Sequence, residues 1–360
     1  MSDTTDFKNM HQMLRDATTV AITMHIRPDG DAIGSALALR MALFNMGKRA
    51  YVFVEGEAPK NFNYIHGWTK IINSINTDDA EASSLTLQDG QCIIEVENNY
   101  DLLVILDTGD EHRIGASKRL RDKCSKVLVF DHHLNPTIKA DTVVSNPTMS
   151  SVGAMLFEFF EKYDIQVTKA MATALYTAVS SDTGCFLFPN TTWYTHYVAS
   201  ELMKIGIDVG DINYRNFRVY DPKTLDGMMK VLEKIQFVND GKIAITYLDY
   251  KLVKKYNFDH DERHRFQRYA TDADGVMVSI FLTEMERDEF NISLRANDQV
   301  NVADIAKQFG GGGHKNAAGM TAKGRYKVVI KQLLSAVEEA LKQFDEATTS
   351  KGKQIEVPNC

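Results

Sequence analysis

Compact apolar runs alternate with segments of helical periodicity along the first 205 residues of the chain. The runs predict buried strands, and the periodic segments between them predict helices. The predicted strands are residues 20–25, 50–54, 102–106 and 126–130, and the predicted helices are residues 7–14, 33–46, 150–163, 168–181 and 191–205. Uninterrupted apolar strands that alternate with helices are typical of a parallel sheet covered on both faces, so the pattern predicts an α/β fold.

The pattern breaks between Gly206 and Tyr220, and a second, smaller α/β unit is predicted beyond that stretch. Its strands are expected at residues 243–248, 276–281 and 290–295, and its last helix at residues 328–344. Because 360 residues exceed the usual size of one domain, we predict two domains. The predicted boundaries are residues 1–205 for the first domain, 206–237 for a linker and connecting helix, 238–345 for the second domain and 346–360 for a loose tail.

Bulk composition narrows the classes of partner. The net charge of −7 argues against a sequence-blind binder of long duplex nucleic acid, which normally needs a basic surface. A small anionic substrate is compatible with this charge, because bound cations reverse the local sign of a site. The four cysteines are scattered without a C-x-x-C pair, and we find neither a basic leader nor an apolar run of about 20 residues, so we expect a cytoplasmic protein without a membrane segment.

The first candidate for chemistry is the segment MHIRPDGDAIGS, at the end of the first predicted strand. His25 ends the strand, and Asp29 and Asp31 follow on either side of Gly30. Gly30 allows a tight turn that aims two carboxylates at one point, and Asp31 stands where a helix N-cap is expected. Taken alone, the segment fits a turn and a capped helix at least as well as a metal site. One histidine and two aspartates within seven positions favour a hard-metal site.

Two further segments follow buried strands, at the edge where ligands bind in open α/β sheets. In VILDTGD, Asp107 ends an apolar strand and Asp110 lies three residues on, which fits a polar turn as well as a ligand site. In VFDHHLN, Asp131, His132 and His133 directly follow a strand. Adjacent histidines on an extended chain face opposite ways, so one can bind metal while the other reaches substrate or a carboxylate.

A fourth segment, SSDTGCF, places Asp182 at the end of a predicted helix. Alone it fits a helix terminus, and its single copy in helical surroundings argues against an aspartic protease. Two divalent ions about 3.5–4 Å apart need several protein ligands and usually one bridging carboxylate. The available set is His25, Asp29, Asp31, Asp107, His132 and Asp182. Mixed imidazole and carboxylate ligands without thiolate suit Mn²⁺ better than a structural zinc, so two divalent ions are predicted.

The motifs HIRPDGDAIGS, LDTGD, DHH and SDTG, in this order, resemble the four motifs of the DHH phosphoesterase family. The run FGGGGHKNAAG resembles the DHH-associated C-terminal domain. Length and motif order are most similar to the bacterial branch of bifunctional oligoribonucleases and pAp phosphatases (nanoRNases). The resemblance covers roughly Thr18 to Leu341 and implies a parallel-sheet DHH domain, a smaller α/β C-terminal domain and an active cleft between them.

The resemblance also implies a role for each residue of the ligand set. The first ion would be held by His25 and Asp29, the second by Asp31, His132 and Asp182, and both by Asp107. His133 would contact the substrate phosphate or support the ligand shell. Asp131 would orient the histidines without itself binding a metal ion.

In the second domain, the glycine run is the candidate substrate-binding segment. Backbone amides without side chains in the way form an anion cradle, and Gly311, Gly312 and Gly313 are predicted to supply it. His314 is predicted to donate to a phosphate or stack on a base, and Arg295 to make a bidentate contact with a terminal phosphate. The alternative is a flexible loop with a surface histidine and arginine, but the entropic cost of four glycines in a folded segment favours function.

The resemblance implies metal-dependent hydrolysis of phosphate esters in short RNA or DNA oligonucleotides and in 3′-phosphoadenosine 5′-phosphate (pAp), and it favours a homodimer. A phosphodiesterase acting on cyclic di-AMP or linear dinucleotides would use the same parts, and a nucleotide-binding regulator without catalysis is the alternative from another class. Two departures from the branch bear on substrate preference. Segment 77–100, expected as an extra hairpin or loop on the sheet's rim, is long, and Leu187 stands where a polar or basic residue is common.

Overall fold

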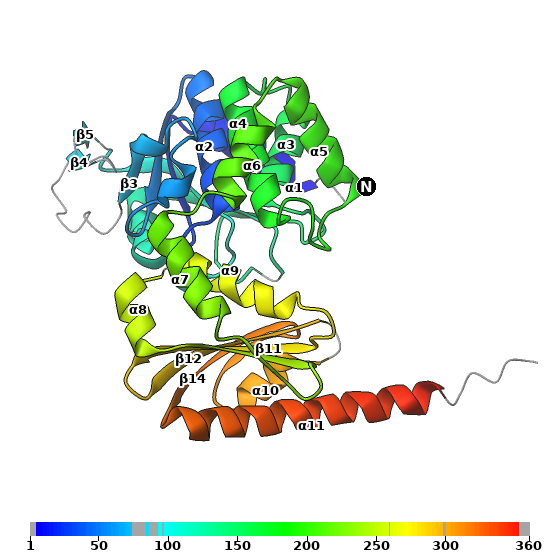
Figure 1. The fold of residues 1–360 in the computed structure, drawn as a ribbon. Coiled ribbons are helices and arrows are strands. Elements are labelled where there is room, and N and C mark those ends of the chain that lie inside the picture. Colours follow the sequence, from blue (N-terminus) through cyan, green and yellow to red (C-terminus); the bar gives the residue numbers. More distant parts are fainter. Residues whose placement is uncertain are drawn as a thin grey trace, which may run out of the picture. The chain divides into compact units, whose positions relative to one another are not determined.

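The computed structural model divides the chain into two compact units, Met1–Val219 and Tyr220–Cys360 (Figure 1). The structure describes residues 5–73, 84–86, 93–95, 97–134, 136–258, 260–297 and 300–352. Each unit has a six-stranded sheet and a hydrophobic core of its own. The α/β fold predicted from the apolar pattern is confirmed in both units.

The sheet of the N-terminal unit consists of six parallel strands in the order β3-β2-β1-β6-β7-β8. The strands are β1 (Thr19–Met24), β2 (Arg49–Val54), β3 (Ile71–Asn73), β6 (Tyr100–Leu106), β7 (Cys124–Asp131) and β8 (Thr142–Ser145). Every residue of β1 is buried, as expected for a central strand covered on both faces. The order of connection reverses between β1 and β6, so their carboxyl ends form the topological switch point at which such sheets bind ligands.

Helices cover both faces of this sheet. They are α1 (Thr5–Asp16), α2 (Gly30–Asn45), α3 (Val152–Lys162), α4 (Lys169–Asp182), α5 (Trp193–Lys204) and α6 (Val209–Phe217), with 3-10 segments η1 (Lys60–Phe62), η2 (Trp68–Lys70) and η4 (Glu111–Lys123). Ile22 of β1 faces the core that contains α2 to α5, whereas Ala21 faces a second core with Ile114 of η4. This alternation of covered faces explains why the strands are continuous apolar runs.

Close packing of α2 against α4 positions two acidic residues. A Cβ on Gly30, the first residue of α2, would lie 2.5 Å from Oγ of Ser181. The predicted role of this glycine in a tight turn is therefore wrong, because it is needed where the start of one helix meets the end of another. The contact places Asp31 of α2 near Asp182 of α4.

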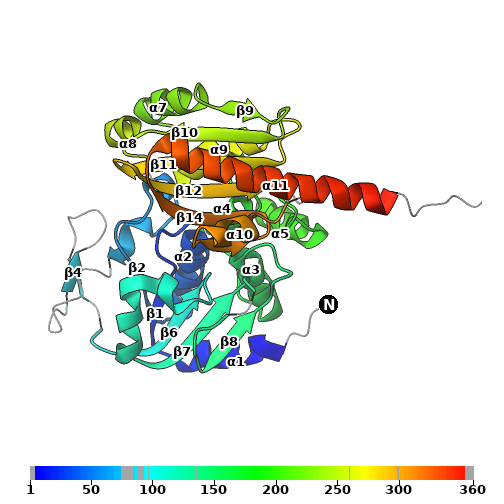
Figure 2. The ribbon, with the colours of Figure 1, turned by 90° about the horizontal axis from the view of Figure 1, so that it is seen from below.

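The sheet of the C-terminal unit is mixed, in the order β13-β14-β12-β11-β10-β9, with β10 and β11 parallel and the other neighbours antiparallel. Its elements are α7 (Pro222–Leu232), β9 (Gln236–Val238), β10 (Ile243–Leu248), α8 (Tyr250–Tyr256), α9 (His260–Thr271), β11 (Val278–Glu286), β12 (Glu289–Ala296), α10 (Val302–Gln308), β13 (Gly312–His314), β14 (Ala317–Lys323) and α11 (Tyr326–Gly352). Val302 of α10 and Leu333 of α11 pack on one face of the sheet (Figure 2). On the other face, Met228 of α7 and Phe266 of α9 share a core with Phe281 of β11.

Residues 206–237, predicted as a linker and connecting helix, contain α6 and α7. Residues 209–217 form α6, whose Ile212 is buried in the core of the N-terminal unit, and α7 packs within the C-terminal unit. The boundary between the units follows Val219, which lies within the stretch from Gly206 to Tyr220 where the pattern breaks. Residues 346–352 of the predicted loose tail belong to α11, and the rest of that tail lies outside the described residues.

Segment 77–100 is described only in part. Its strands β4 (Ser84–Thr86) and β5 (Ile93–Glu95) pair antiparallel, as in the predicted hairpin, and the residues between them lie outside the described part of the chain. Over the described residues, no helix combines the length and apolarity that crossing a membrane requires.

Candidate metal centre

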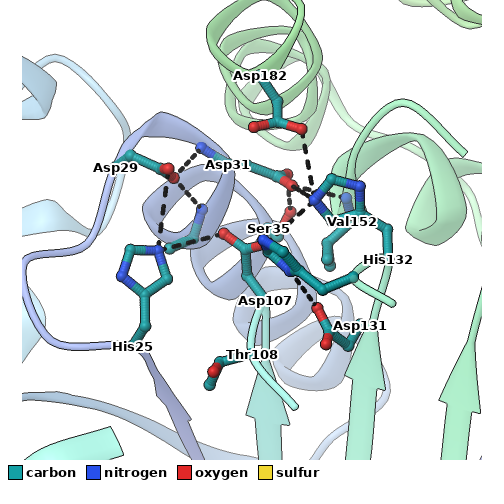
Figure 3. A network of polar contacts seen from close by, with 12 residues as sticks. His25, Asp29, Asp31, Ser35, Asp107, Thr108, Asp131, His132, Val152 and Asp182 are labelled. Carbon is teal, nitrogen blue, oxygen red and sulfur yellow. Dashed lines mark hydrogen bonds and ion pairs between the residues drawn. The ribbon is translucent and has the colours of Figure 1, made fainter. Parts of the chain in front are cut away.

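Acidic and histidine side chains converge at the carboxyl edge of the parallel sheet (Figure 3). His25 follows β1, Asp107 follows β6, Asp131 ends β7, His132 and His133 come next, Asp29 and Asp31 stand at the start of α2, and Asp182 ends α4. The carboxyl ends of parallel strands share one edge, which is why residues up to 157 positions apart in sequence can meet there.

Asp107 lies at the centre of the cluster. Its Oδ2 is 3.4 Å from Nε2 of His25, and its Oδ1 is 3.5 Å from Nε2 of His132. The backbone of Asp107 is left-handed, with φ 58°, a conformation that aspartate tolerates better than most residues and that concentrates at functional sites. The two oxygens of one buried carboxylate thus face two different histidines.

Asp107 belongs to two of three overlapping groups of potential ligands found among the described residues. His25, Asp29 and Asp107 form the first group, with ligand atoms within 4.8 Å of one another. The second group, under the same limit, consists of Asp31, His132 and Asp182, and His132 also groups with Asp107 and His133. The structure therefore brings together all the residues that the sequence singled out in the N-terminal unit as metal ligands.

Asp31 is fully buried and is held from three directions. Its carboxylate accepts hydrogen bonds from the backbone amides of Val152 (2.7 Å) and Gly153 (2.9 Å) and from the hydroxyl of Ser35 (3.0 Å). The two amides belong to the first turn of α3, where unpaired N–H groups and the helix dipole favour an anion. The sequence suggested Asp31 as the N-cap of α2, but it is not the N-cap. Its orientation is fixed by its hydrogen bonds with α3.

The N-cap of α2 is Asp29. Its Oδ1 accepts hydrogen bonds from the amides of Asp31 and Ala32, at 3.0 and 3.1 Å. Its Oδ2 lies 3.9 Å from Nε2 of His25. One oxygen therefore stabilises the helix while the other faces the cluster.

Asp131 and His133 form a supporting pair. Asp131 is fully buried, and its Oδ1 accepts a 2.7 Å hydrogen bond from Nδ1 of His133. The ring of His133 is 45% exposed, so its other nitrogen is available beyond the cluster. Asp110, which does not belong to the predicted ligand set, is exposed and caps η4 by accepting from the amide of His112.

The protonation of the cluster reflects its excess of carboxylates. Burial alone would lower the pKa of His25 and His132, but neighbouring carboxylates, Asp107 first among them, raise it to about 10 in each case. Burial and carboxylate neighbours raise the pKa of Asp182 to about 7 and that of Asp31 well above its usual range. Burial opposes ionisation of Asp107 too, yet the two histidines outweigh it and lower the pKa of this carboxyl.

The spacing of these atoms suits a shared cation better than a shared proton. Within the described residues, Oδ1 of Asp107, Oδ2 of Asp131 and Nε2 of His132 are buried without a hydrogen-bond partner. Ion-pair distances of 3.4 to 3.9 Å within the cluster are too long for good hydrogen bonds. Two ligand atoms that are each about 2.1 Å from one divalent ion lie roughly 3 Å apart. Carboxylate oxygens and imidazole nitrogens are also the donor set for hard or borderline divalent ions, so these residues fit such a group.

The candidates in the C-terminal unit lie on its sheet. Arg295 of β12 is partly buried, which lowers its pKa, and its Nη1 donates to Oγ of Ser293 and to the carbonyl of Leu294. The second half of the glycine run is a strand and not a loop, since Gly312 to His314 pair with β14. A Cβ on Gly311 or Gly313 would lie within 2.4 Å of a β14 carbonyl oxygen, which gives both glycines a packing role. Gly312 has open space beside it, and His314 is exposed.

Two supporting residues were not predicted from the sequence. Ser35 donates to Asp31, and the side-chain amide of Asn190 donates to the carbonyls of Ser150 and Asp182, at 3.1 Å each. Ser35 stands one helical turn after Asp31, a spacing that signals such a contact. Nothing in the sequence signals the contact of Asn190, which depends on the turn after α4.

The fold and this cluster define a two-unit α/β protein with a carboxylate and imidazole centre suited to divalent cations. Residues 19–179 match the model of the DHH family, N-terminal domain, and residues 240–348 match that of the DHHA1 domain. The chain therefore carries a DHH domain followed by a DHHA1 domain, as the motifs predicted. The DHH family comprises metal-dependent phosphoesterases, which confirms the predicted class of enzyme at the level of the family.

Curated relatives and solved structures cover most of the chain. The bifunctional oligoribonuclease and PAP phosphatase NrnA of Thermus thermophilus is 29% identical over 326 residues, 89% of this chain and 90% of that protein. The cyclic-di-AMP phosphodiesterase PdeA of Listeria monocytogenes is 27% identical over 352 residues, 91% of this chain but 49% of that protein. The crystal structure of an exopolyphosphatase-related protein from Bacteroides fragilis is similar with a TM-score of 0.83 at 24% identity, covering 95% of this chain and 98% of that one, which supports the fold.

Proposed function

We propose that this protein hydrolyses phosphate esters in short oligonucleotides and in pAp, with two divalent cations held by the DHH domain. The observation that carries the proposal is the position of Asp107, whose two oxygens face two separate groups of potential ligands. The name of the relative from Thermus thermophilus supports the substrate class. Mn²⁺ is the preferred cation in this proposal, because the donors are imidazoles and carboxylates without thiolate.

The proposed ligands divide as the two groups do. His25 and Asp29 would hold one cation, Asp31, His132 and Asp182 the other, and Asp107 both. When bound, such a pair of cations acidifies a bridging water and neutralises the charge of the phosphoryl oxygens. Asp31 reaches its position already oriented by the amides of α3, so little reorganisation is needed on binding.

His133 is proposed to contact the substrate phosphate. Asp131 accepts from its Nδ1, which fixes the ring and leaves Nε2 on the exposed side of the imidazole. With Nδ1 hydrogen-bonded to Asp131, Nε2 is the ring nitrogen left to meet a phosphoryl oxygen. Asp131 is therefore a positioning residue in this scheme and His133 the residue that meets the substrate.

The C-terminal unit is proposed to bind the part of the substrate that is not cleaved. Arg295, Gly312 and His314 are the strongest of its candidates, because Gly311 and Gly313 already have a packing reason to be glycine. An arginine suits a phosphate, and an exposed strand amide or imidazole suits a phosphate or a base.

The test is a substrate panel on metal-free protein to which Mn²⁺ is added back. pAp, a dinucleotide and a trinucleotide are followed by product length, with cyclic di-AMP alongside because of the similarity to the phosphodiesterase from Listeria monocytogenes. Turnover of pAp and of the linear oligonucleotides that depends on Mn²⁺ supports the proposal. Turnover of cyclic di-AMP alone would assign the second activity instead. Tight nucleotide binding without turnover under any divalent cation would indicate a regulator.

A further inference from the structure

Two exposed arginines lie at the edge of the candidate metal centre, and the proposed chemistry uses neither. Arg27 stands between His25 and Asp29 in the loop after β1, and Arg113 stands at the start of η4 in the segment after β6. The amide of Ile26 donates to the carbonyl oxygen of Arg113 at 2.5 Å. This hydrogen bond places the two arginine-bearing segments side by side at the switch point of the sheet.

The backbone that carries the arginines is held in place. Arg27 has a left-handed φ of 53° directly before a proline, a conformation that is disfavoured and persists only where the surroundings enforce it. Arg113 donates its amide to the carbonyl of Asp110, and the next residue, Ile114, is fully buried. The amide of Ala116 donates to the carboxylate of Glu55. The two arginines are therefore attached to backbone that hydrogen bonds and buried neighbours hold in place.

The acidic residues around these two segments are already committed to other partners. Asp29 caps α2 and faces His25, Asp110 caps η4, Glu55 accepts from a backbone amide, and Glu111 pairs with Arg121. Across the described chain neither Arg27 nor Arg113 forms an ion pair, although the sequence holds 48 acidic residues. Two uncommitted cations thus remain at the edge of a strongly acidic centre.

We propose that Arg27 and Arg113 together bind a second phosphate group of the substrate, next to the phosphate that is cleaved. This inference rests on the proposed function and narrows it to substrates that carry at least two phosphate groups. Guanidinium groups form forked, charge-assisted hydrogen bonds with phosphate oxygens. Their positive charge also offsets the repulsion that clustered carboxylates exert on an approaching anion. Both arginines belong to the N-terminal unit, whereas Arg295 belongs to the C-terminal unit.

The test compares two dinucleotides that differ by one phosphate, 5′-phosphorylated pApA and unphosphorylated ApA. The ratio of their kcat/KM values is measured for the Mn²⁺-loaded wild type and for Arg27→Ala, Arg113→Ala and Arg113→Lys. We expect the wild type to have the higher kcat/KM for pApA. In each alanine variant the ratio of kcat/KM for pApA to that for ApA should fall about tenfold, because a hydrogen bond to a charged group is lost. Arg113→Lys should keep part of the preference. Salt at 0.5 M KCl should reduce the preference of the wild type and whatever part Arg113→Lys retains.

Arg15→Ala is the matched control. Arg15 is also exposed and without an ion pair in the described chain, but it precedes β1 and so lies at the amino end of the strand. Its loss should leave the ratio unchanged. Three outcomes would each overturn the inference. The wild type could fail to discriminate between pApA and ApA, or the kcat/KM ratio could stay unchanged in Arg27→Ala and Arg113→Ala. The third outcome is a preference for pApA that disappears only in Arg295→Ala.

Equilibrium binding separates this inference from the proposed function. Both dinucleotides are titrated into metal-free protein, in which no metal-dependent turnover takes place. Tighter binding of pApA that is lost in Arg113→Ala supports the phosphate site even if no hydrolysis is found with any metal. Hydrolysis without an arginine-dependent difference between the dinucleotides supports the enzyme and rejects the phosphate site.

Discussion

Replacement of Asp107 by asparagine removes the one side chain that faces both ligand groups. The carboxylate has one oxygen 3.4 Å from Nε2 of His25 and the other 3.5 Å from Nε2 of His132. Asparagine keeps the size of the side chain but offers a single neutral oxygen, so it cannot join two cations. We expect Asp107→Asn to fold, to bind Mn²⁺ weakly and to lose turnover of pAp by about a thousandfold, because the charge stabilisation supplied by the cations amounts to several kcal/mol.

The loss of metal binding has a measurable size. Loss of an outer partner weakens a metal site about 10–100-fold, so about 100-fold is a lower bound for a shared ligand. At a Mn²⁺ concentration of about 100 times the wild-type Kd, the metal stabilises the wild type by about 2.7 kcal/mol and such a variant by about 0.4 kcal/mol. In a unit of this size, 1 kcal/mol corresponds to about 2–4 °C, so the Mn²⁺-induced rise in Tm should fall from about 5–10 °C to about 1 °C.

The assay is thermal unfolding of EDTA-treated protein with and without Mn²⁺, paired with turnover of pAp. Asp110→Asn is the matched control, because Asp110 caps η4 and is exposed, and asparagine caps a helix as well as aspartate does. That variant should keep both the rise in Tm and the turnover. An Asp107→Asn variant with a full Mn²⁺-induced rise in Tm and turnover within tenfold of wild type would refute the bridging role.

Three further outcomes are expected. Because carboxylates raise the pKa of His25 and His132 to about 10, both rings are protonated in metal-free protein at pH 7. Mn²⁺ must therefore displace their protons. Calorimetry in buffers of different ionisation heat should show this proton release and an affinity for Mn²⁺ that rises with pH up to about 10. Ser35→Ala removes a donor to Asp31 and should weaken Mn²⁺ binding about tenfold in the same titration. Asp29→Asn keeps the cap of α2, so the metal-free Tm should stay within about 2 °C of wild type while the Mn²⁺-induced rise shrinks.

The sequence predicted the part of the site that follows from the sheet. His25, Asp107 and His132 each come directly after an apolar run, and parallel strands bring their carboxyl ends to one edge, so the convergence of these residues follows from the order of strands and polar residues along the chain. The family motifs in their order pointed to the same residues and to the DHH domain that the comparisons confirm.

What the sequence could not show depends on contacts between distant elements. Asp31 is held by amides more than 120 positions away, at the start of α3, and no periodicity in either segment signals that contact. The stretch between Gly206 and Tyr220 resembles a break because its glycines interrupt the apolar pattern, yet nine of its residues form α6 and pack on the first unit. Glycines that weaken a helix in isolation are outweighed there by burial of Ile212.

The two interpretations of the motif HIRPDGDAIGS, a capped helix or a metal site, prove not to be alternatives. A carboxylate has two oxygens, and Asp29 uses one to cap α2 and turns the other towards His25. Asp31 uses both oxygens to accept from the first turn of α3, and its Oδ2 also lies 3.9 Å from Nε2 of His132. The hydrogen bonds that stabilise the helices also fix the rotamers of the proposed ligands, so the helices supply the preorganisation that a metal centre needs. The same hydrogen bonds therefore stabilise the starts of α2 and α3 and orient the proposed metal ligands at this edge of the sheet.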